Sequence, residues 1–152
     1  MPSSKAMAEP TLFDRILNKT LPSHKVAEDE LWYSFLDIFP RREGHALIIP
    51  KQSVQRLSDL STPMRNALFA GVVEVQNILS KYFETDDFTV CIHDGPLAGQ
   101  EVSHVHVHVI PRHSGDGGST LQAMWPHAPP MGEEADHGIL HTLSMNLQEV
   151  IL

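Results

Sequence analysis

The chain has 152 residues, of which 41% are hydrophobic and 20% charged, and its formal net charge is -8 when its ten histidines are counted as neutral. This balance predicts an ordinary globular protein, with a flexible N-terminus over residues 1–10 and a single domain over residues 11–152 that ends in an extension and a helix. The negative charge argues against binding long nucleic acid through its phosphates, and it leaves no basic patch for a membrane surface.

Cys91 is the chain's one cysteine, so no disulfide can form within the chain and a reducing compartment is favoured. The sequence contains no apolar stretch long enough to span a bilayer and no hydrophobic segment near its first residues. We therefore expect no membrane contact, and the cytoplasm is the default location.

The first half of the chain predicts a helix, a hairpin and a second, longer helix. Residues 12–17 (LFDRIL) have the apolar spacing of a short helix, and residues 31–38 and 45–49 predict two strands joined by the polar turn 40–44. The longer helix begins at Ser61-Thr62-Pro63, where a hydroxyl and a proline suit a helix N-terminus. Its predicted buried positions follow in steps of three and four: Met64, Leu68, Val72, Val75, Leu79 and Tyr82.

The second half predicts another antiparallel hairpin. Residues 88–92 form its first strand and residues 94–96 a turn, and the loop is long enough to enclose a ligand. The glycine- and proline-rich segment after Arg112 is expected to be mostly irregular. A C-terminal helix is marked by Ile139, Leu140, Leu143, Leu147 and Ile151. These elements add up to an α+β domain built on antiparallel strands.

The second strand of this hairpin carries histidine at every second position. Within SHVHVHVIP, His104, His106 and His108 share one face of the predicted strand, and the intervening valines share the other. Pro111 lacks the amide proton that an internal ladder needs, so the strand should end near Ile110. Three charged imidazoles at this spacing would repel one another, so we expect them to be mostly neutral at neutral pH.

Two kinds of chemistry suit such a face. Zinc could be bound by His104 and His106 with a third ligand, either His93 or His45. Alternatively, the central imidazole could attack a phosphorus atom while its neighbours donate to the phosphate oxygens.

Residues just before this strand suit the second reading. Gly95 and Gly99 let the backbone come close to a phosphate, and Gln100 adds a neutral amide donor.

The run HVHVHVIPR, preceded by DGPLAGQ, resembles the signature of the histidine triad (HIT) superfamily, and the likeness extends from about residue 11 to about residue 112. It implies an antiparallel sheet of about five strands flanked by helices, usually in a homodimer. It also implies a nucleotide hydrolase or transferase that acts at the α-phosphate through a covalent nucleotidyl-histidine intermediate. The substrate would be a nucleoside phosphoramidate or a dinucleoside polyphosphate, with adenosine preferred and AMP as a product.

The resemblance also implies a role for individual residues. His106 matches the nucleophile, and His104 and His108 match the flanking histidines that contact phosphate oxygens and orient it. Gln100 matches the glutamine near the scissile bond, and Asp37 matches the acidic residue that binds the ribose hydroxyls, a role that its two acceptor oxygens suit. The remaining nucleotide-binding residues are the backbone-exposing Gly99 and the apolar walls around the base, Leu12, Phe13, Ile16, Phe35 and Ile38.

Several positions depart from the family's pattern. His93 stands where the family usually has Asn or Gln to help hold the phosphate or ribose, and we include it among the nucleotide-binding residues. Glu101 replaces a hydroxyl residue, and since a carboxylate would repel a phosphate we expect it to point away. Thr11 and Asp14 stand where some relatives have the C-x-x-C of a structural zinc, so no metal or cofactor is expected.

Other residues keep two interpretations open. His45 matches the family's Gly-His pair, and it is equally well explained as a buried, hydrogen-bonded histidine. Trp125 resembles a C-terminal element near the active site or dimer partner, or it anchors a surface loop. No role is expected for the other histidines: His24, His113, His127, His137 and His141. Two other classes of function stay open, a metal-dependent hydrolase that uses the histidine strand and a non-catalytic nucleotide-binding module.

Overall fold

The computed structural model describes residues 9–118, 123–127 and 134–150. The chain divides into two compact units, the first ending at Asp116 and the second beginning at Gly117. Most of the predicted flexible N-terminus, residues 1–8, lies outside the described residues. No helix in the described ranges combines the length and the apolar composition needed to cross a bilayer.

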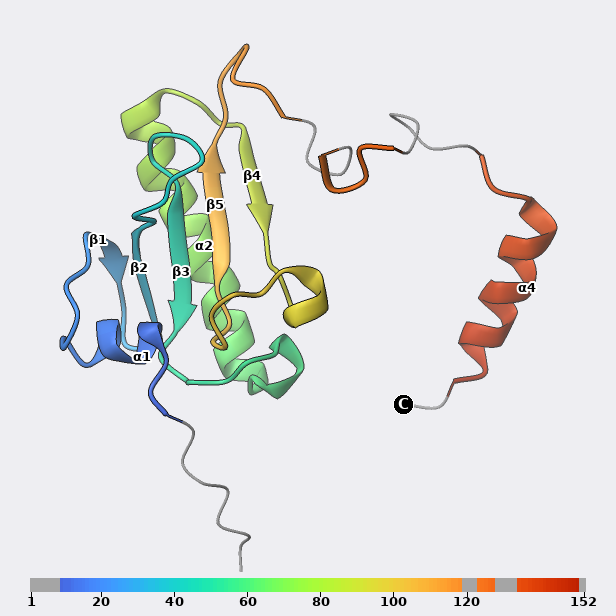
Figure 1. Cartoon of the computed structure of the whole chain (residues 1–152), viewed down its shortest axis with the longest axis horizontal. Coiled ribbons are helices and arrows are strands. Elements are labelled where there is room, and N and C mark those ends of the chain that lie inside the picture. The colour runs from blue at the N-terminus through green and yellow to red at the C-terminus, as the bar shows by residue number, and fades with distance from the viewer. Residues whose placement is uncertain (1–8, 119–122, 128–133, 151–152) are drawn as a thin grey trace, which may run out of the picture. The chain divides into compact units, whose positions relative to one another are not determined.

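The first unit is built on a five-stranded antiparallel sheet with the order β1-β2-β3-β5-β4 (Figure 1). Its strands are β1 (Lys25–Glu28), β2 (Trp32–Leu36), β3 (Ala46–Pro50), β4 (Phe88–Cys91) and β5 (Val107–Pro111). The structure confirms the α+β class and both predicted hairpins. It adds β1, a short, half-exposed edge strand that the sequence analysis missed because its four residues show no clear alternation.

Two helices accompany the sheet, α1 (Leu12–Leu17) and α2 (Thr62–Phe83), and both were predicted. Ser61 caps α2 by accepting a hydrogen bond from the amide of Met64, as its hydroxyl suggested. Figure 1 shows α2 running along one face of the sheet behind β3 and β5. The valines of β5 pack in the core, and His108 and Ile110, which alternate with them, are on the opposite face of the strand.

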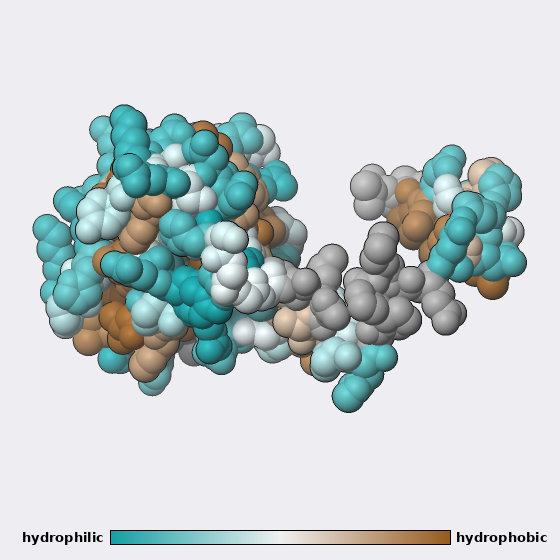
Figure 2. All heavy atoms as spheres, turned by 90° about the horizontal axis from the view of Figure 1, so that it is seen from above, coloured by the Kyte–Doolittle hydropathy of each residue, from teal (hydrophilic) through white to brown (hydrophobic). Residues whose placement is uncertain are grey.

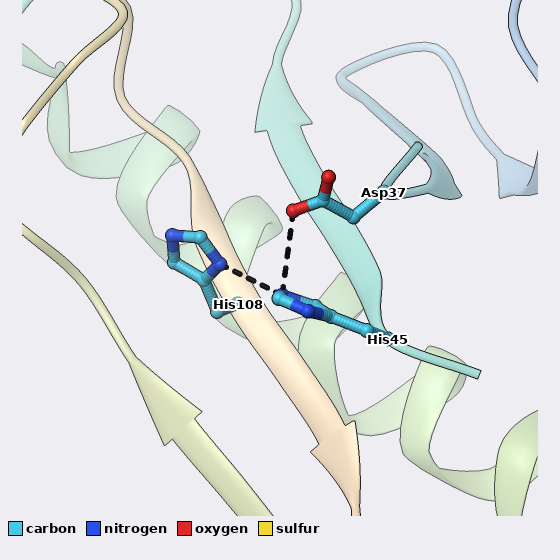
Figure 3. Close-up of side chains that lie close together, drawn as sticks. All are labelled: Asp37, His45 and His108. Carbon is cyan, nitrogen blue, oxygen red and sulfur yellow. Dashed lines mark hydrogen bonds and ion pairs between the residues drawn. The ribbon is translucent and has the colours of Figure 1, made fainter. Parts of the chain in front are cut away.

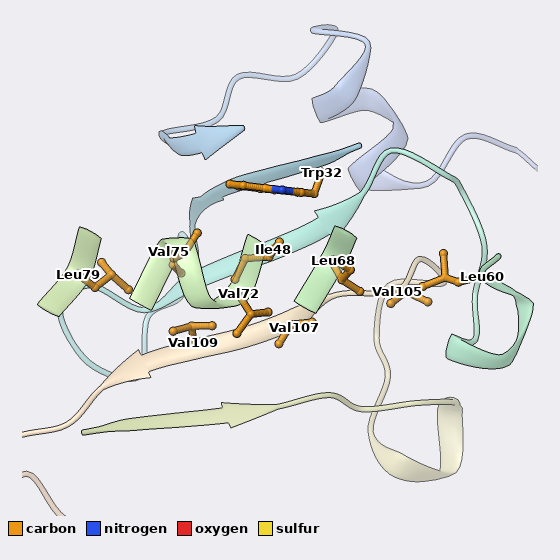
Figure 4. Packing of buried hydrophobic residues seen from close by; sticks show 11 residues of the cluster. Trp32, Ile48, Leu60, Leu68, Val72, Val75, Leu79, Val105, Val107 and Val109 are labelled. Carbon is orange, nitrogen blue, oxygen red and sulfur yellow. The ribbon is translucent and has the colours of Figure 1, made fainter. Parts of the chain in front are cut away.

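The main core lies between α2 and the sheet (Figure 4). Gly71 allows α2 to approach the sheet closely, since a Cβ there would lie 2.7 Å from ring atoms of Trp32.

The prediction that Tyr82 is buried is wrong, because this residue is 77% exposed and the next residue, Phe83, packs against the core instead. Phe83 lies four positions after Leu79 and Tyr82 lies three positions after it. With 3.6 residues per helical turn, the residue four positions on stays closer to the buried face. The residues of the core cluster are Trp32, Ala46, Ile48, Leu60, Leu68, Val72, Val75, Leu79, Val105, Val107 and Val109.

The histidine strand is shorter at its start than predicted and longer at its end. It begins at Val107 because the amide of Val105 donates to the carbonyl of Val54, outside the sheet. It ends at Pro111, opposite Phe88, rather than near Ile110. The pairing of β5 with β3 has already ended by then, so the missing amide proton of the proline interrupts no bond on that side.

The second unit contains α4 (His137–Gln148), which confirms the predicted C-terminal helix. Asp136 caps it by accepting a hydrogen bond from the amide of Ile139 at 3.0 Å. Of the residues that predicted this helix, Ile151 lies outside the described residues. Of the segment predicted to be irregular, residues 119–122 and 128–133 lie outside them as well. Trp125 belongs to the second unit, and its predicted place near the site stays a prediction.

Candidate active site

The histidine face of the sheet borders a small apolar cluster that α1 completes. Phe13 and Phe35 are buried there with Leu47 and Ile49, and Ile16 packs against them. The ring of Phe13 meets the ring of His106 edge-on, with centroids 5.0 Å apart. Figure 2 shows that the visible surface of the first unit is largely hydrophilic, with apolar side chains gathered in patches.

Three of the five predicted base-wall residues therefore come together: Phe13, Ile16 and Phe35. The other two, Leu12 and Ile38, are 50% and 69% exposed and do not pack in this cluster.

His106 is held in one tautomer by the backbone. Its Nδ1 lies 2.8 Å from the carbonyl oxygen of His104, which can only accept, so Nδ1 carries the proton. In the neutral ring Nε2 then carries the lone pair. Burial lowers the pKa of His106, which keeps the ring neutral near pH 7. This fits the expected state of a nucleophile.

His108 receives its tautomer from His45 (Figure 3). The amide of Arg41 donates to Nδ1 of His45 at 3.1 Å, so the ring proton of His45 is on Nε2. That nitrogen lies 2.9 Å from Nδ1 of His108, which must accept. The proton of neutral His108 is therefore on Nε2, where it can donate to an anion.

Burial keeps both rings of this pair neutral. It lowers the pKa of His45, and together with the neighbouring His106, His45 and His93 it lowers the pKa of His108 to about 4. The side chain of His45 is 3% exposed, so it is a buried, hydrogen-bonded histidine and also a link to the predicted site. The two interpretations of His45 are thus compatible.

Asp37 stands at the edge of this pair. Its Oδ2 lies 3.6 Å from Nε2 of His45, and its Oδ1 accepts a hydrogen bond from the amide of Phe39 at 2.8 Å. The carboxylate is half-buried, so it keeps an accessible side.

His104 lies differently from the other two members of the triad. Its ring is fully buried, with Nε2 2.9 Å from the carbonyl oxygen of Pro50 and Nδ1 3.6 Å from Oδ1 of Asp14. Both nitrogens face protein groups, so the expected contact of this side chain with phosphate oxygens does not fit the geometry. His104 instead holds His106 through its backbone carbonyl.

Hydrogen bonds of Gln100 hold the loop before the triad in place. Gln100 accepts a hydrogen bond from the amide of Gly95 at 3.0 Å and donates to the carbonyl of Gln55 at 2.9 Å. Both the oxygen and the nitrogen of its carboxamide are thus hydrogen-bonded within the protein. This suits a structural role in the loop better than the expected place at the scissile bond. One amide hydrogen is left for a ligand.

His93 also fixes this loop, since its Nδ1 donates to the carbonyl of Ala98 at 2.6 Å. Its ring meets that of His108 edge-on, with centroids 5.4 Å apart. Gly99 has φ +94, and a Cβ there would lie 3.1 Å from Nδ1 of His93, so glycine suits both the backbone and the contact. Glu101 is exposed.

The described residues include one candidate group for a metal ion, Asp37, His45 and His108, whose ligand atoms lie within 4.8 Å of one another. To bind a metal, Nε2 of His45 would have to give up the proton that the Arg41 amide places on it. The same proton accounts for the short distance to His108, so these residues fit a hydrogen-bonded pair better than a metal site. In the predicted zinc pair, one nitrogen of His104 and one of His106 donate to backbone carbonyls, so only Nδ1 of His104 and Nε2 of His106 are left to bind a metal.

The histidines for which no role was expected are exposed: His24, His113, His127, His137 and His141. Sequence reasoning missed the contact between Asp14 and His104 and the link from His45 to His108. The Gly-His pair was a sequence signal for the link from His45 to His108, but nothing in the sequence indicated the contact between Asp14 and His104.

The neutral imidazole of His106, on one face of an antiparallel sheet, has its lone pair on Nε2. Such an arrangement is a histidine-based site suited to attack on phosphorus. The chain belongs to the HIT domain family, whose family model matches residues 18–115, inside the first unit. The expected family and fold are thereby confirmed.

Relatives of known name support this assignment. The adenosine 5'-monophosphoramidase of Saccharomyces cerevisiae is 37% identical over 115 residues, which are 76% of this chain and 69% of that protein. The asymmetrical bis(5'-nucleosyl)-tetraphosphatase of Schizosaccharomyces pombe is 42% identical over 83 residues, 55% of this chain and only 46% of that protein. The histidine triad nucleotide-binding protein of Candida albicans superposes with a TM-score of 0.77 at 30% identity, covering 91% of this chain and 95% of that one.

Proposed function

We propose that this protein is a nucleotide hydrolase that acts at the α-phosphate of an adenosine nucleotide through a covalent nucleotidyl-His106 intermediate and releases AMP. The observation that carries the proposal is the hydrogen bond from Nδ1 of His106 to the carbonyl of His104, which leaves the lone pair on Nε2. The substrate is a nucleoside phosphoramidate or a dinucleoside polyphosphate, and the relatives with those two activities in their names support both classes.

The reaction takes place in two displacements. The lone pair on Nε2 of His106 attacks the α-phosphorus, the bond to the amine or phosphate leaving group breaks, and that group takes up a proton. Water then attacks the same phosphorus and releases a proton to the solvent, which balances the proton taken up by the leaving group; the bond to Nε2 breaks, and AMP leaves. In both steps Nε2–H of His108 donates to the phosphate oxygens where negative charge gathers.

The nucleoside lies against the apolar cluster on the same face. Phe13, Ile16 and Phe35 contact the base, and the accessible side of the Asp37 carboxylate accepts hydrogen bonds from the ribose hydroxyls. All of these residues are in the first unit, so that unit is the catalytic one.

The protein acts as a homodimer in the cytoplasm. β4 lies at the edge of the described sheet, where its outward-facing backbone groups and the exposed Val90 offer a surface on which a second copy can extend the sheet. Light scattering that gives the mass of one chain at micromolar concentration would contradict the dimer.

Replacement of the nucleophile tests the mechanism. We expect His106→Ala to bind AMP but to lose turnover by about three orders of magnitude or more, whereas the matched variant His113→Ala, at an exposed histidine outside the site, keeps its rate. Acid-labile nucleotide attached to the chain should be trapped from quenched reactions of the unmodified protein and of His113→Ala, but not from those of His106→Ala.

Near-normal turnover in His106→Ala would refute the covalent step. No turnover in the unmodified protein, with AMP binding retained, would instead support a nucleotide-binding module. A panel of adenosine phosphoramidate and diadenosine tri- and tetraphosphate distinguishes the two substrate classes.

A further inference from the structure

Nδ1 of His104 is a buried nitrogen that has no hydrogen-bond partner among the described residues. It belongs to a ring with no exposed surface, and Oδ1 of Asp14 lies 3.6 Å away. The other nitrogen of the ring, Nε2, lies 2.9 Å from the carbonyl of Pro50. His104 therefore stands between two groups that can only accept hydrogen bonds, a carbonyl and a carboxylate.

This placement decides which protons the ring can carry. The carbonyl of Pro50 requires a proton on Nε2, so a neutral His104 would turn the lone pair of Nδ1 toward the negative charge of Asp14. A second proton on Nδ1 removes that repulsion and satisfies the buried nitrogen. Because a carboxyl group is the stronger acid, this proton belongs to the imidazole and not to Asp14.

We propose that Asp14 and His104 form a buried ion pair, in which His104 is doubly protonated and Asp14 is a positioning residue for the nucleophile. The kinetic part of this inference rests on the proposed function. The expectation of a neutral ring then holds for His106 and His108 but not for His104. Burial is the largest effect on His104 and lowers its pKa overall, although the Pro50 carbonyl and the Asp14 carboxylate each raise it. The charged form is favoured by geometry, because two groups that can only accept hydrogen bonds lie on opposite sides of the ring.

The pair would position the nucleophile through two connections. Asp14 belongs to α1, where its Oδ2 accepts a hydrogen bond from the amide of Thr11 at 2.8 Å while Oδ1 faces His104. The adjacent Phe13 packs edge-on against His106, so the ion pair sets the distance between the base wall and the nucleophile. His104 also holds His106 through its carbonyl oxygen.

The charge of His104 would also keep the nucleophile free of a second proton. The charged and titratable groups that act on His106 are His104 and His93, which disfavour its protonation, and Asp37, which favours it. His108 lies edge-on to the same ring, with centroids 5.1 Å apart. A cation at His104 therefore helps to keep the lone pair on Nε2 of His106 available.

Histidine-labelled full-length protein tests the ion pair directly by nitrogen NMR, without any substrate. At neutral pH we expect His104 to show protons on both ring nitrogens, with a slowly exchanging proton on Nδ1. In Asp14→Asn it should show a proton on Nε2 alone, since the amide can donate to the Nδ1 lone pair. Thr11→Ala is the matched control, because it removes the other half of the helix cap but leaves the carboxylate facing His104.

A lone proton on Nε2 in the unmodified protein at neutral pH would overturn the proposal, whether or not Asp14→Asn folds. A doubly protonated ring that persists in Asp14→Asn would overturn it too. This readout is independent of turnover, so it separates the ion pair from the proposed hydrolase activity.

Kinetics provide the second readout. We expect Asp14→Asn to lower kcat/KM about tenfold and to move the acid limb of its pH profile to higher pH, because neutral His104 no longer opposes protonation of His106. Thr11→Ala should leave the acid limb in place. The same acid limb in both variants would show that Asp14 acts only through the helix cap, which contradicts the proposal.

Discussion

Replacing His45 should lower kcat/KM, because His45 holds His108 in one tautomer. In His45→Leu the amide of Arg41 and Nδ1 of His108 both lose their partner. His108 is then free to place its proton on Nδ1, which turns a lone pair on Nε2 toward the substrate phosphate. The hydrogen bond from His45 favours the Nε2–H tautomer of His108 by the free energy of one partly buried hydrogen bond, about 1.4 to 2.7 kcal/mol. Losing it corresponds to a fall in kcat/KM of about 10- to 100-fold.

Steady-state hydrolysis of adenosine phosphoramidate at neutral pH measures this effect, and thermal unfolding shows whether each variant is folded. His45→Gln is the conservative variant, since its carboxamide can accept from Arg41 and donate to His108, and it should recover much of the rate. A folded His45→Leu with kcat/KM within about twofold of the unmodified protein would refute the assignment of the tautomers.

Three further predictions concern the pH profile, the core and the loop. Because burial lowers the pKa of His106, kcat/KM should fall only below the ordinary imidazole value of about 6.5, and an acid limb above that value in a pH series would contradict the buried, neutral nucleophile. Gly71→Ala would place a Cβ 2.7 Å from the ring of Trp32, so denaturant unfolding should show a loss of about 1 to 3 kcal/mol, compared with little change for the exposed Ala70→Ser. Gln100→Ala leaves the amide of Gly95 without its partner, so kcat/KM should fall about tenfold while the melting temperature changes little, and an unchanged rate would show that this hydrogen bond is dispensable.

Stability should depend on pH in the same direction as activity. In the folded protein burial lowers the pKa of His45, His106 and His108, the last to about 4, so below about pH 6.5 the unfolded chain binds more protons than the folded one. Unfolding free energy contributed by these rings is therefore present above this pH and is lost as the pH falls toward 4. Denaturant melts at pH 7 and pH 5 check this, and equal stability at both would contradict it.

Local signals in the sequence were sufficient for most of the fold. The hydroxyl of Ser61, the following proline and the apolar steps to Leu79 predicted α2 because helix caps and helix periodicity depend on neighbouring residues only. Alternation of histidine and valine likewise assigned the two faces of the segment, and the valines do pack in the core. The motif around the triad identified the family before any geometry was known.

Signals of this kind failed where contacts with distant residues prevail. β1 is a short edge strand that exists because β2 offers it a partner, and its own four residues predict little. The histidine segment is a regular strand only from Val107, since the backbone before it pairs with the loop that contains Val54. The hydrogen bond from Gln100 to the carbonyl of Gln55, which lies 45 positions away, was likewise not predicted.

The chemical state of each histidine shows the same division most clearly. The spacing in HVHVHVIP by itself determined that the three imidazoles leave the backbone on the side opposite the core valines. Only the tertiary structure decided that His104 faces Pro50 and Asp14 and that His108 faces His45. A periodic pattern specifies the direction in which a side chain leaves the backbone, whereas the proton on each ring nitrogen follows from the donor or acceptor that folding places beside it.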